Sequence, residues 1–194
     1  TYIFFVSVSI MTYSCKSDSR SKKNTGSGTS FDNRGTAMML DLIRAEEMFA
    51  AGKLHQALGL IDELVSKKPQ WADPYLLKGN IYTAVGQHDQ ARSAYEKLVR
   101  IDPDYLSAWF KLGNIVYRKK QYREAINFYN QELTGQQATT LQSKDKQITM
   151  LQIGRCYMHL GKADSALIIY NECMAIDSLY SEVMGDVARL HIDN

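Results

Sequence analysis

Large apolar and small residues recur along this chain with a period of about 34 residues between Met38 and Tyr180. The clearest copy covers residues 72–105, and the next copy starts in register at Leu106. In the clearest copy the recurring positions are Tyr75, Gly79, Tyr82, Gly86, Ala91, Tyr95 and Pro103. Spacings of three and four residues place side chains on one face of a helix, and a glycine commonly follows a helix end. Each copy therefore predicts two helices joined by a tight turn.

The repeated pattern predicts an all-α protein in which helical hairpins stack to bury faces that one hairpin cannot bury alone. Within a domain of residues 36–194, we assign hairpins to 38–71, 72–105, 106–139 and 147–180, and a cap or partial fifth hairpin to 181–194. Residues 134–143 interrupt the period and form either a loop or an extension of the neighbouring helices. The expected fold is an α-solenoid of four hairpins plus a partial fifth helix.

The recurring residues resemble those of the tetratricopeptide repeat family. The last full copy restores the pattern with Met150, Ile153, Gly154, Tyr157, Gly161, Ala166 and Tyr170. The first copy departs from it, with Asp41, Arg44 and Ala45 where an aromatic residue, an aliphatic residue and a glycine are usual. The resemblance implies that the first helix of each hairpin lines a concave groove.

Carried over residue by residue, the resemblance implies a peptide-binding groove. Its residues are Leu76, Asn80, Phe110, Asn114, Tyr117, Arg118, Leu151 and Arg155. An asparagine amide can donate to and accept from a peptide backbone, and the apolar side chains suit an extended segment or a helix. Arg118 and Arg155 favour an acidic residue or a C-terminal carboxylate. Alternatively, some of these residues pack against the cap or the tail of the same chain.

The front of the chain has the character of an export signal. Residues 2–11 are uncharged and largely apolar, and this run is too short to cross a bilayer core of roughly 30 Å as a helix. Ser14 before Cys15 resembles the processing site of bacterial lipoproteins, which implies lipidation of Cys15, although Thr12 and Tyr13 depart from that pattern. Residues 1–15 then form a signal peptide truncated at its start. The alternatives are a plain signal with an incidental cysteine, or part of a longer membrane anchor.

Residues 16–35 separate this segment from the repeats and predict a disordered tether. They are rich in Ser, Gly and Asn, and Phe31 is their one large apolar residue. They carry five basic residues against two acidic ones, whereas the whole chain has a net charge of only +2. Because the excess positive charge lies in the tether, the folded part shows no bulk charge suited to nucleic acid.

The sequence indicates no catalytic, cofactor or metal site. The histidines, His55, His88, His159 and His191, each lack a second ligand three or four residues away. Cys156 and Cys173 occupy small slots on the two helices of one hairpin, where we expect packing thiols. A disulfide between them stays open, because sequence gives no Cα geometry.

These observations predict a non-enzymatic adaptor that binds a protein or peptide in its groove and is tethered to a bacterial membrane by lipid. It looks like the small repeat lipoproteins that help assemble envelope machines. Lys16 follows the cysteine, where an aspartate would favour the inner membrane, so we expect the outer membrane, facing the periplasm. A secreted or periplasmic protein is the alternative. The chain could also be the N-terminal module of a larger peptidoglycan-associated protein, as its abrupt start and end suggest, or the regulator of an enzyme.

Overall fold

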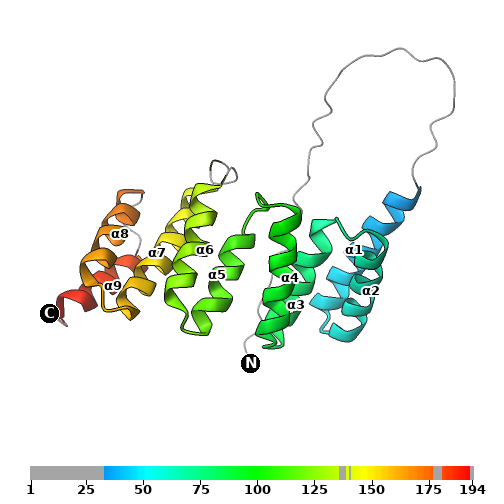
Figure 1. The fold of residues 1–194 in the computed structure, drawn as a ribbon, viewed down its shortest axis with the longest axis horizontal. Coiled ribbons are helices and arrows are strands. Elements are labelled where there is room, and N and C mark those ends of the chain that lie inside the picture. Colours follow the sequence, from blue (N-terminus) through cyan, green and yellow to red (C-terminus); the bar gives the residue numbers. More distant parts are fainter. Residues whose placement is uncertain (1–32, 136–138, 140, 177–180, 193–194) are drawn as a thin grey trace, which may run out of the picture. The chain divides into compact units, whose positions relative to one another are not determined.

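The structure, a computed structural model, describes residues 33–135, 139, 141–176 and 181–192. This part of the chain forms helices and no strand (Figure 1). The helices are α1 (Asn33–Ala50), α2 (Leu54–Lys67), α3 (Ala72–Ala84), α4 (His88–Ile101), α5 (Ala108–Arg118), α6 (Tyr122–Thr134), α7 (Ser143–His159), α8 (Ala163–Ile176) and α9 (Ser181–Ile192). The predicted all-α fold is confirmed.

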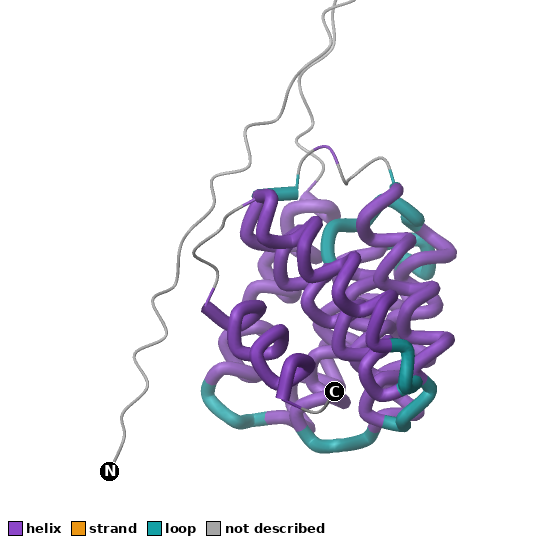
Figure 2. The backbone as a smooth tube through the Cα atoms, turned by 90° about the vertical axis from the view of Figure 1, so that its left-hand side faces the viewer, coloured by secondary structure: helices purple, strands orange, loops and turns teal. Residues whose placement is uncertain are grey.

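Consecutive helices from α2 to α9 lie side by side, so that α3–α4, α5–α6 and α7–α8 form hairpins and each hairpin contacts the next. Figure 2 looks along this stack from the end that carries α9, with the connecting loops at the ends of the helices. Because every hairpin packs against its neighbours, the first helices α3, α5 and α7 occupy equivalent places in successive hairpins.

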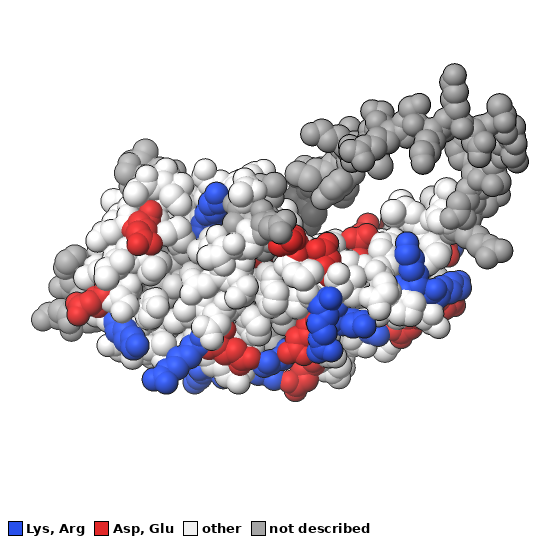
Figure 3. All heavy atoms as spheres, turned by 45° about the horizontal axis from the view of Figure 1, so that its top comes forward, with Lys and Arg blue, Asp and Glu red and all other residues white. Residues whose placement is uncertain are grey.

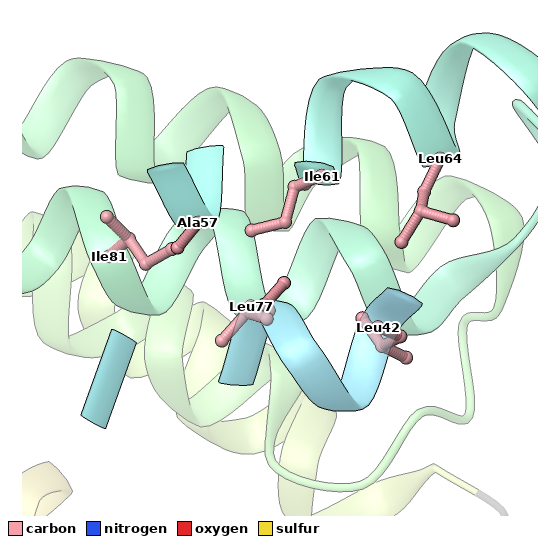
Figure 4. Close-up of a cluster of buried hydrophobic side chains, with 7 residues drawn as sticks. Leu42, Ala57, Ile61, Leu64, Leu77 and Ile81 are labelled. Atoms are coloured by element: carbon pink, nitrogen blue, oxygen red, sulfur yellow. The ribbon is translucent and has the colours of Figure 1, made fainter. Parts of the chain in front are cut away.

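A buried core continues from hairpin to hairpin. Its first part joins α1, α2 and α3 through side chains that point toward one another in Figure 4. These are Leu42, Ala45, Ala57, Ile61, Leu64, Leu77 and Ile81. Leu77 of α3 thus packs against the hairpin that precedes its own, which shows how the apolar face of one repeat is covered by the next.

Within a hairpin, a tyrosine ring of the second helix lies against a glycine of the first. A Cβ built on this glycine would lie 2.1–2.4 Å from the nearest ring carbon in all three cases. The pairs are Gly79 with Tyr95, Gly113 with Tyr129, and Gly154 with Tyr170. The tyrosines are at most 2% exposed. The Tyr95 ring lies on the glycine of its own hairpin and also belongs to a core cluster with Ala108 and Leu112 of the next one.

The turns between paired helices require a left-handed residue. Gly52, Gly86 and Gly161 take φ angles of +74°, +75° and +69° there. In the α5–α6 turn the same position is Lys120, at φ 61°. A residue with a Cβ is strained in this region, so the third hairpin keeps the turn geometry without the glycine that favours it.

Two helices begin earlier than the repeat pattern predicts. α1 starts at Asn33, inside the range 16–35 expected for the tether, and α7 starts at Ser143, inside the interrupting segment 134–143. Part of that segment therefore extends α7, which was one of the two alternatives. The rest of the tether and the whole of 1–15, with Cys15, lie outside the described residues. No helix in the described ranges is long and apolar enough to span a membrane.

Cys156 of α7 and Cys173 of α8 are free thiols, both fully buried. The Cys173 Sγ donates to the Gln147 carbonyl oxygen at 3.5 Å. Burial raises the pKa of Cys156 to about 12 and that of Cys173 to about 11. The two side chains therefore act as packing groups of the fourth hairpin rather than as a disulfide or as nucleophiles.

Candidate peptide-binding groove

All residues predicted to line the groove lie on first helices. Leu76 and Asn80 are on α3, Phe110 to Arg118 on α5, and Leu151 and Arg155 on α7. Leu76, Asn80, Phe110, Asn114 and Tyr117 are partly exposed, Arg118 is exposed, and Leu151 is buried. The structure thus divides the predicted set into an accessible group on α3 and α5 and a group on α7 that other parts of the chain occupy.

The two asparagines hold the tyrosines of their own hairpins. Tyr95 Oη donates to Asn80 Oδ1 at 2.9 Å, and Tyr129 Oη donates to Asn114 Oδ1 at 2.8 Å. Burial raises the pKa of both tyrosines, so these hydroxyls stay protonated donors. Since each amide oxygen is engaged inside the hairpin, what an asparagine offers a ligand is its NH₂ group.

The apolar residues of the groove are anchored in the core beneath them. Leu76 packs against the cluster that contains Tyr95 and Leu98. The Phe110 ring lies 5.6 Å from the Tyr129 ring, tilted by 44°. Both residues are partly exposed, so each presents a fixed apolar surface rather than a free side chain.

The residues predicted on α7 are covered by α9. Leu151 is 1% exposed and shares a core cluster with Val183 of α9. Arg155 Nε donates to Asp186 Oδ2 at 2.8 Å, and its NH2 group lies 3.5 Å from Glu182 Oε2. The prediction that Leu151 is open to a ligand is therefore wrong in this structure, whereas Arg155 is partly exposed and already paired with α9. The alternative, packing against the cap of the same chain, holds for both.

Two cations on α5 have no acidic partner among the described residues. Arg118 is exposed at the end of the helix, and Lys111 is partly buried. Lys111 holds in its hairpin the position that Leu77 holds in the preceding one. Desolvation lowers the pKa of Lys111, because burial penalises its charged form. Lys111 was not among the residues predicted for the groove, although a lysine in an apolar position of the repeat can be seen in the sequence.

Next to α9 the surface contains a pocket of about 330 Å³. Its lining residues are Tyr117, Arg155, Met158, His159, Tyr170 and Asp186. Tyr117 Oη lies 3.0 Å from His159 Nε2, and the His159 ring stacks on Tyr122 with centroids 4.5 Å apart and planes 11° apart. Burial raises the pKa of Tyr117. The pocket joins α5, α7, α8 and α9, and two residues predicted for the groove, Tyr117 and Arg155, line it.

The charges on the molecular surface are mixed. On the face shown in Figure 3, basic and acidic side chains alternate along the lower edge, and a broad area above it carries few charges. Arg92 of α4 illustrates this mixing, since it pairs with Glu96 at 2.8 Å and with Glu124 of the next hairpin at 2.7 Å. Among the described residues, no three His, Cys, Asp or Glu side chains are grouped so as to hold a metal ion.

Comparison with known proteins agrees with the repeat pattern. A family model described as TPR repeat matches residues 79–120, and one described as Tetratricopeptide repeat matches residues 149–178. The solved structure of MamA from Desulfovibrio magneticus superposes with a TM-score of 0.69 at 13% identity, over 80% of this chain and 84% of that one. The chain contains tetratricopeptide repeats.

Two further comparisons are also distant in sequence. YrrB, described as having an unusual peptide-binding site, superposes with a TM-score of 0.62 at 18% identity, over 74% of this chain and 70% of that one. Anaphase-promoting complex subunit 3 of Schizosaccharomyces pombe is 23% identical over 122 residues. These cover 63% of this chain but only 17% of that subunit. At such identities the structural likeness establishes the fold alone.

Proposed function

We propose that this tetratricopeptide repeat protein is a non-enzymatic adaptor that holds a segment of a partner protein across α3 and α5. Cys15 carries the lipid that tethers it to the bacterial outer membrane, facing the periplasm, where it helps to assemble an envelope machine. The observation that carries the binding proposal is the pair of asparagine NH₂ groups on successive first helices, each fixed through a tyrosine.

These two donors can bind the backbone of a polypeptide. Asn80 and Asn114 occupy equivalent places in consecutive hairpins, and their amide oxygens are already engaged. Their NH₂ groups can therefore donate to carbonyl oxygens of a bound segment without rearrangement, which limits the entropy that binding costs. Leu76 and Phe110 provide apolar surface beside the donors.

The charges on α5 favour an acidic segment. Arg155 is paired with α9, so the cations left for a partner are Lys111 and Arg118. A partner carboxylate beside Lys111 offsets the desolvation that this lysine already bears in the free protein. The preference for an acidic residue or a C-terminal carboxylate, expected from Arg118 and Arg155, is thus proposed to rest on Arg118 and Lys111 of α5.

Exchange of both asparagines for aspartate tests the groove. Asn80→Asp and Asn114→Asp keep an acceptor for the tyrosine hydroxyls but replace the NH₂ donors by negative oxygens. We expect recovery of the partner from native membranes, measured by quantitative mass spectrometry, to fall at least about tenfold, which corresponds to about 1.4 kcal/mol. Asn130→Asp, at an exposed position of the second helix α6, is the matched control and should recover the partner normally. Equal recovery with the double variant, folded by circular dichroism, would remove the groove from this proposal.

Lipid tethering is tested separately through Cys15. Expressed in its native host, the protein should incorporate a fatty-acid label and sediment with outer membranes, because an acyl chain adds buried CH₂ groups to the lipid phase. Cys15→Ser should abolish the label and release the protein, whereas Cys156→Ser, at a buried thiol, should leave both unchanged. Label that persists in Cys15→Ser would contradict lipidation at this residue.

A further inference from the structure

The repeat is broken at one position beside the pocket. In the second and third hairpins, the residue after the close-packed glycine is an asparagine that receives the tyrosine hydroxyl. In the fourth hairpin this residue is Arg155, whose guanidinium turns to Asp186 of α9. Tyr170, the equivalent tyrosine, lines the pocket. The substitution of Arg for Asn therefore coincides with the place where the groove surface opens into a cavity.

The pocket has room for one large group rather than for a length of peptide. Its volume of about 330 Å³ is at the lower end of the range of roughly 300–1,000 Å³ that ligand pockets span. It adjoins the accessible groove, because Tyr117 of α5 belongs to both. A segment lying along α3 and α5 thus reaches the pocket with a side chain at one end of its path.

Charges in the wall exclude an ionic occupant. Arg155 repels a cation, and Asp186, which holds Arg155, repels an anion. Arg155 and Asp186 already form an ion pair at 2.8 Å. A charged ligand would have to replace one member of this pair in order to bind the other, so it would gain little. An uncharged group is what this electrostatic environment accepts.

The remaining wall is suited to an aromatic ring. Tyr117, His159 and Tyr170 contribute rings, and Met158 contributes a thioether, which makes favourable contacts with aromatic edges. Tyr117 and His159 are joined by their hydrogen bond, with centroids 5.8 Å apart and planes at 61°. His159 is further fixed by stacking on Tyr122. These rings are held in place before a ligand arrives, so little freedom is lost on binding.

We propose that this pocket receives one neutral aromatic side chain from the partner segment in the groove. The identity of the donor segment rests on the proposed function, whereas the chemistry of the pocket does not. An aromatic anchor at one end and acidic groups over α5 together define the partner's recognition sequence.

Single-residue amides test the pocket without a known partner. With the protein labelled at its methionine methyl groups, N-acetyl-tryptophanamide and N-acetyl-phenylalaninamide should shift the Met158 signal saturably in NMR spectra. N-acetyl-leucinamide should bind at least about tenfold more weakly, and the glutamate and lysine analogues should give no saturable shift. The Met39 signal, from an exposed methionine on α1, serves as an internal reference and should not move. Equal shifts for leucine and aromatic amides, or for Met39 and Met158, would overturn the proposal.

A variant in which the pocket is filled provides a second test of the proposal. Met158→Trp places an indole in the cavity and should abolish the ligand-observed saturation transfer from N-acetyl-tryptophanamide. Met39→Trp, the same change at an exposed position, should retain it. Saturation transfer that persists in folded Met158→Trp would refute the pocket.

Failure of the amides to bind while partner recovery still depends on Asn80 and Asn114 overturns the pocket and leaves the adaptor intact. Amide binding at Met158 with partner recovery independent of the asparagines supports the pocket alone.

Discussion

Replacing Gly113 by alanine is expected to destabilise the protein by about 2–3 kcal/mol, because the new methyl group meets a ring that cannot move. Its Cβ would lie 2.4 Å from Tyr129 Cε1. Tyr129 is fully buried and its hydroxyl is bound to Asn114, so relief requires α5 to move away from α6. Alanine would otherwise stabilise a helix by about 1 kcal/mol relative to glycine, so the overpacking decides the sign.

Gly59→Ala is the matched control for this prediction. Gly59 lies within α2, and a Cβ there has no neighbour within 4 Å. Helix propensity then acts alone, and the free energy of unfolding in urea should rise by up to about 1 kcal/mol. Adding Tyr129→Leu to Gly113→Ala should recover part of the loss by making room for the methyl group. If Gly113→Ala and Gly59→Ala shift the urea midpoint alike, the glycine–tyrosine contact does not limit the approach of the helices.

The fold was largely predictable because its determinants are local and repeated. Gly79 and Tyr95 belong to one short sequence unit, and the same spacing recurs with Gly113 and Tyr129. A helical period places such residues on defined faces whatever the rest of the chain does. The helix starts that were missed, at Asn33 and Ser143, lie where the repeat has no strong position to mark the boundary.

The site was less predictable because it depends on how side chains are shared between helices. The amide oxygens of Asn80 and Asn114 accept hydrogen bonds from tyrosines of their own hairpins. This arrangement follows from the close approach of the two helices at the glycine, and the spacing of residues in the sequence does not reveal it. Arg155 was expected to face a ligand, but Asp186 and Glu182 of α9 reach it first. A repeat pattern fixes which face a residue is on, whereas its partner depends on the residues of the next helix.

Glu132 is the clearest example of an interaction that the sequence did not reveal. This residue of α6 is 1% exposed, and its Oε1 and Oε2 accept from the backbone N–H groups of Ser107 and Phe110 at 2.9 and 3.2 Å. The Ser107 side chain does not cap α5. Because the first N–H groups of a helix lack partners within it, Glu132 supplies the missing acceptors from 22 and 25 residues further along the chain.

Glu132→Ala should therefore lower the free energy of unfolding by about 3 kcal/mol, since it leaves buried N–H donors without an acceptor. Glu63→Ala, at an exposed residue of α2 that pairs with Lys67 at 3.5 Å, is the matched control. It should change stability by less than about 0.5 kcal/mol. Both values are measured by urea unfolding. Similar losses from the two variants would show that α5 does not need the carboxylate at its first turn.

The same carboxylate should give the protein a distinctive dependence on pH. Burial raises the pKa of Glu132 above its usual 4.5, although backbone donors at Ser107 and Phe110 act in the opposite direction. Between 4.5 and the raised value, the folded state binds a proton that the unfolded state has lost, so stability increases as pH falls through this window. Glu132→Gln does not titrate. Urea unfolding from pH 7.5 to 4.5 should therefore show the natural protein gaining stability relative to Glu132→Gln as pH falls, while an opposite slope would mean that the fold favours the ionised carboxylate.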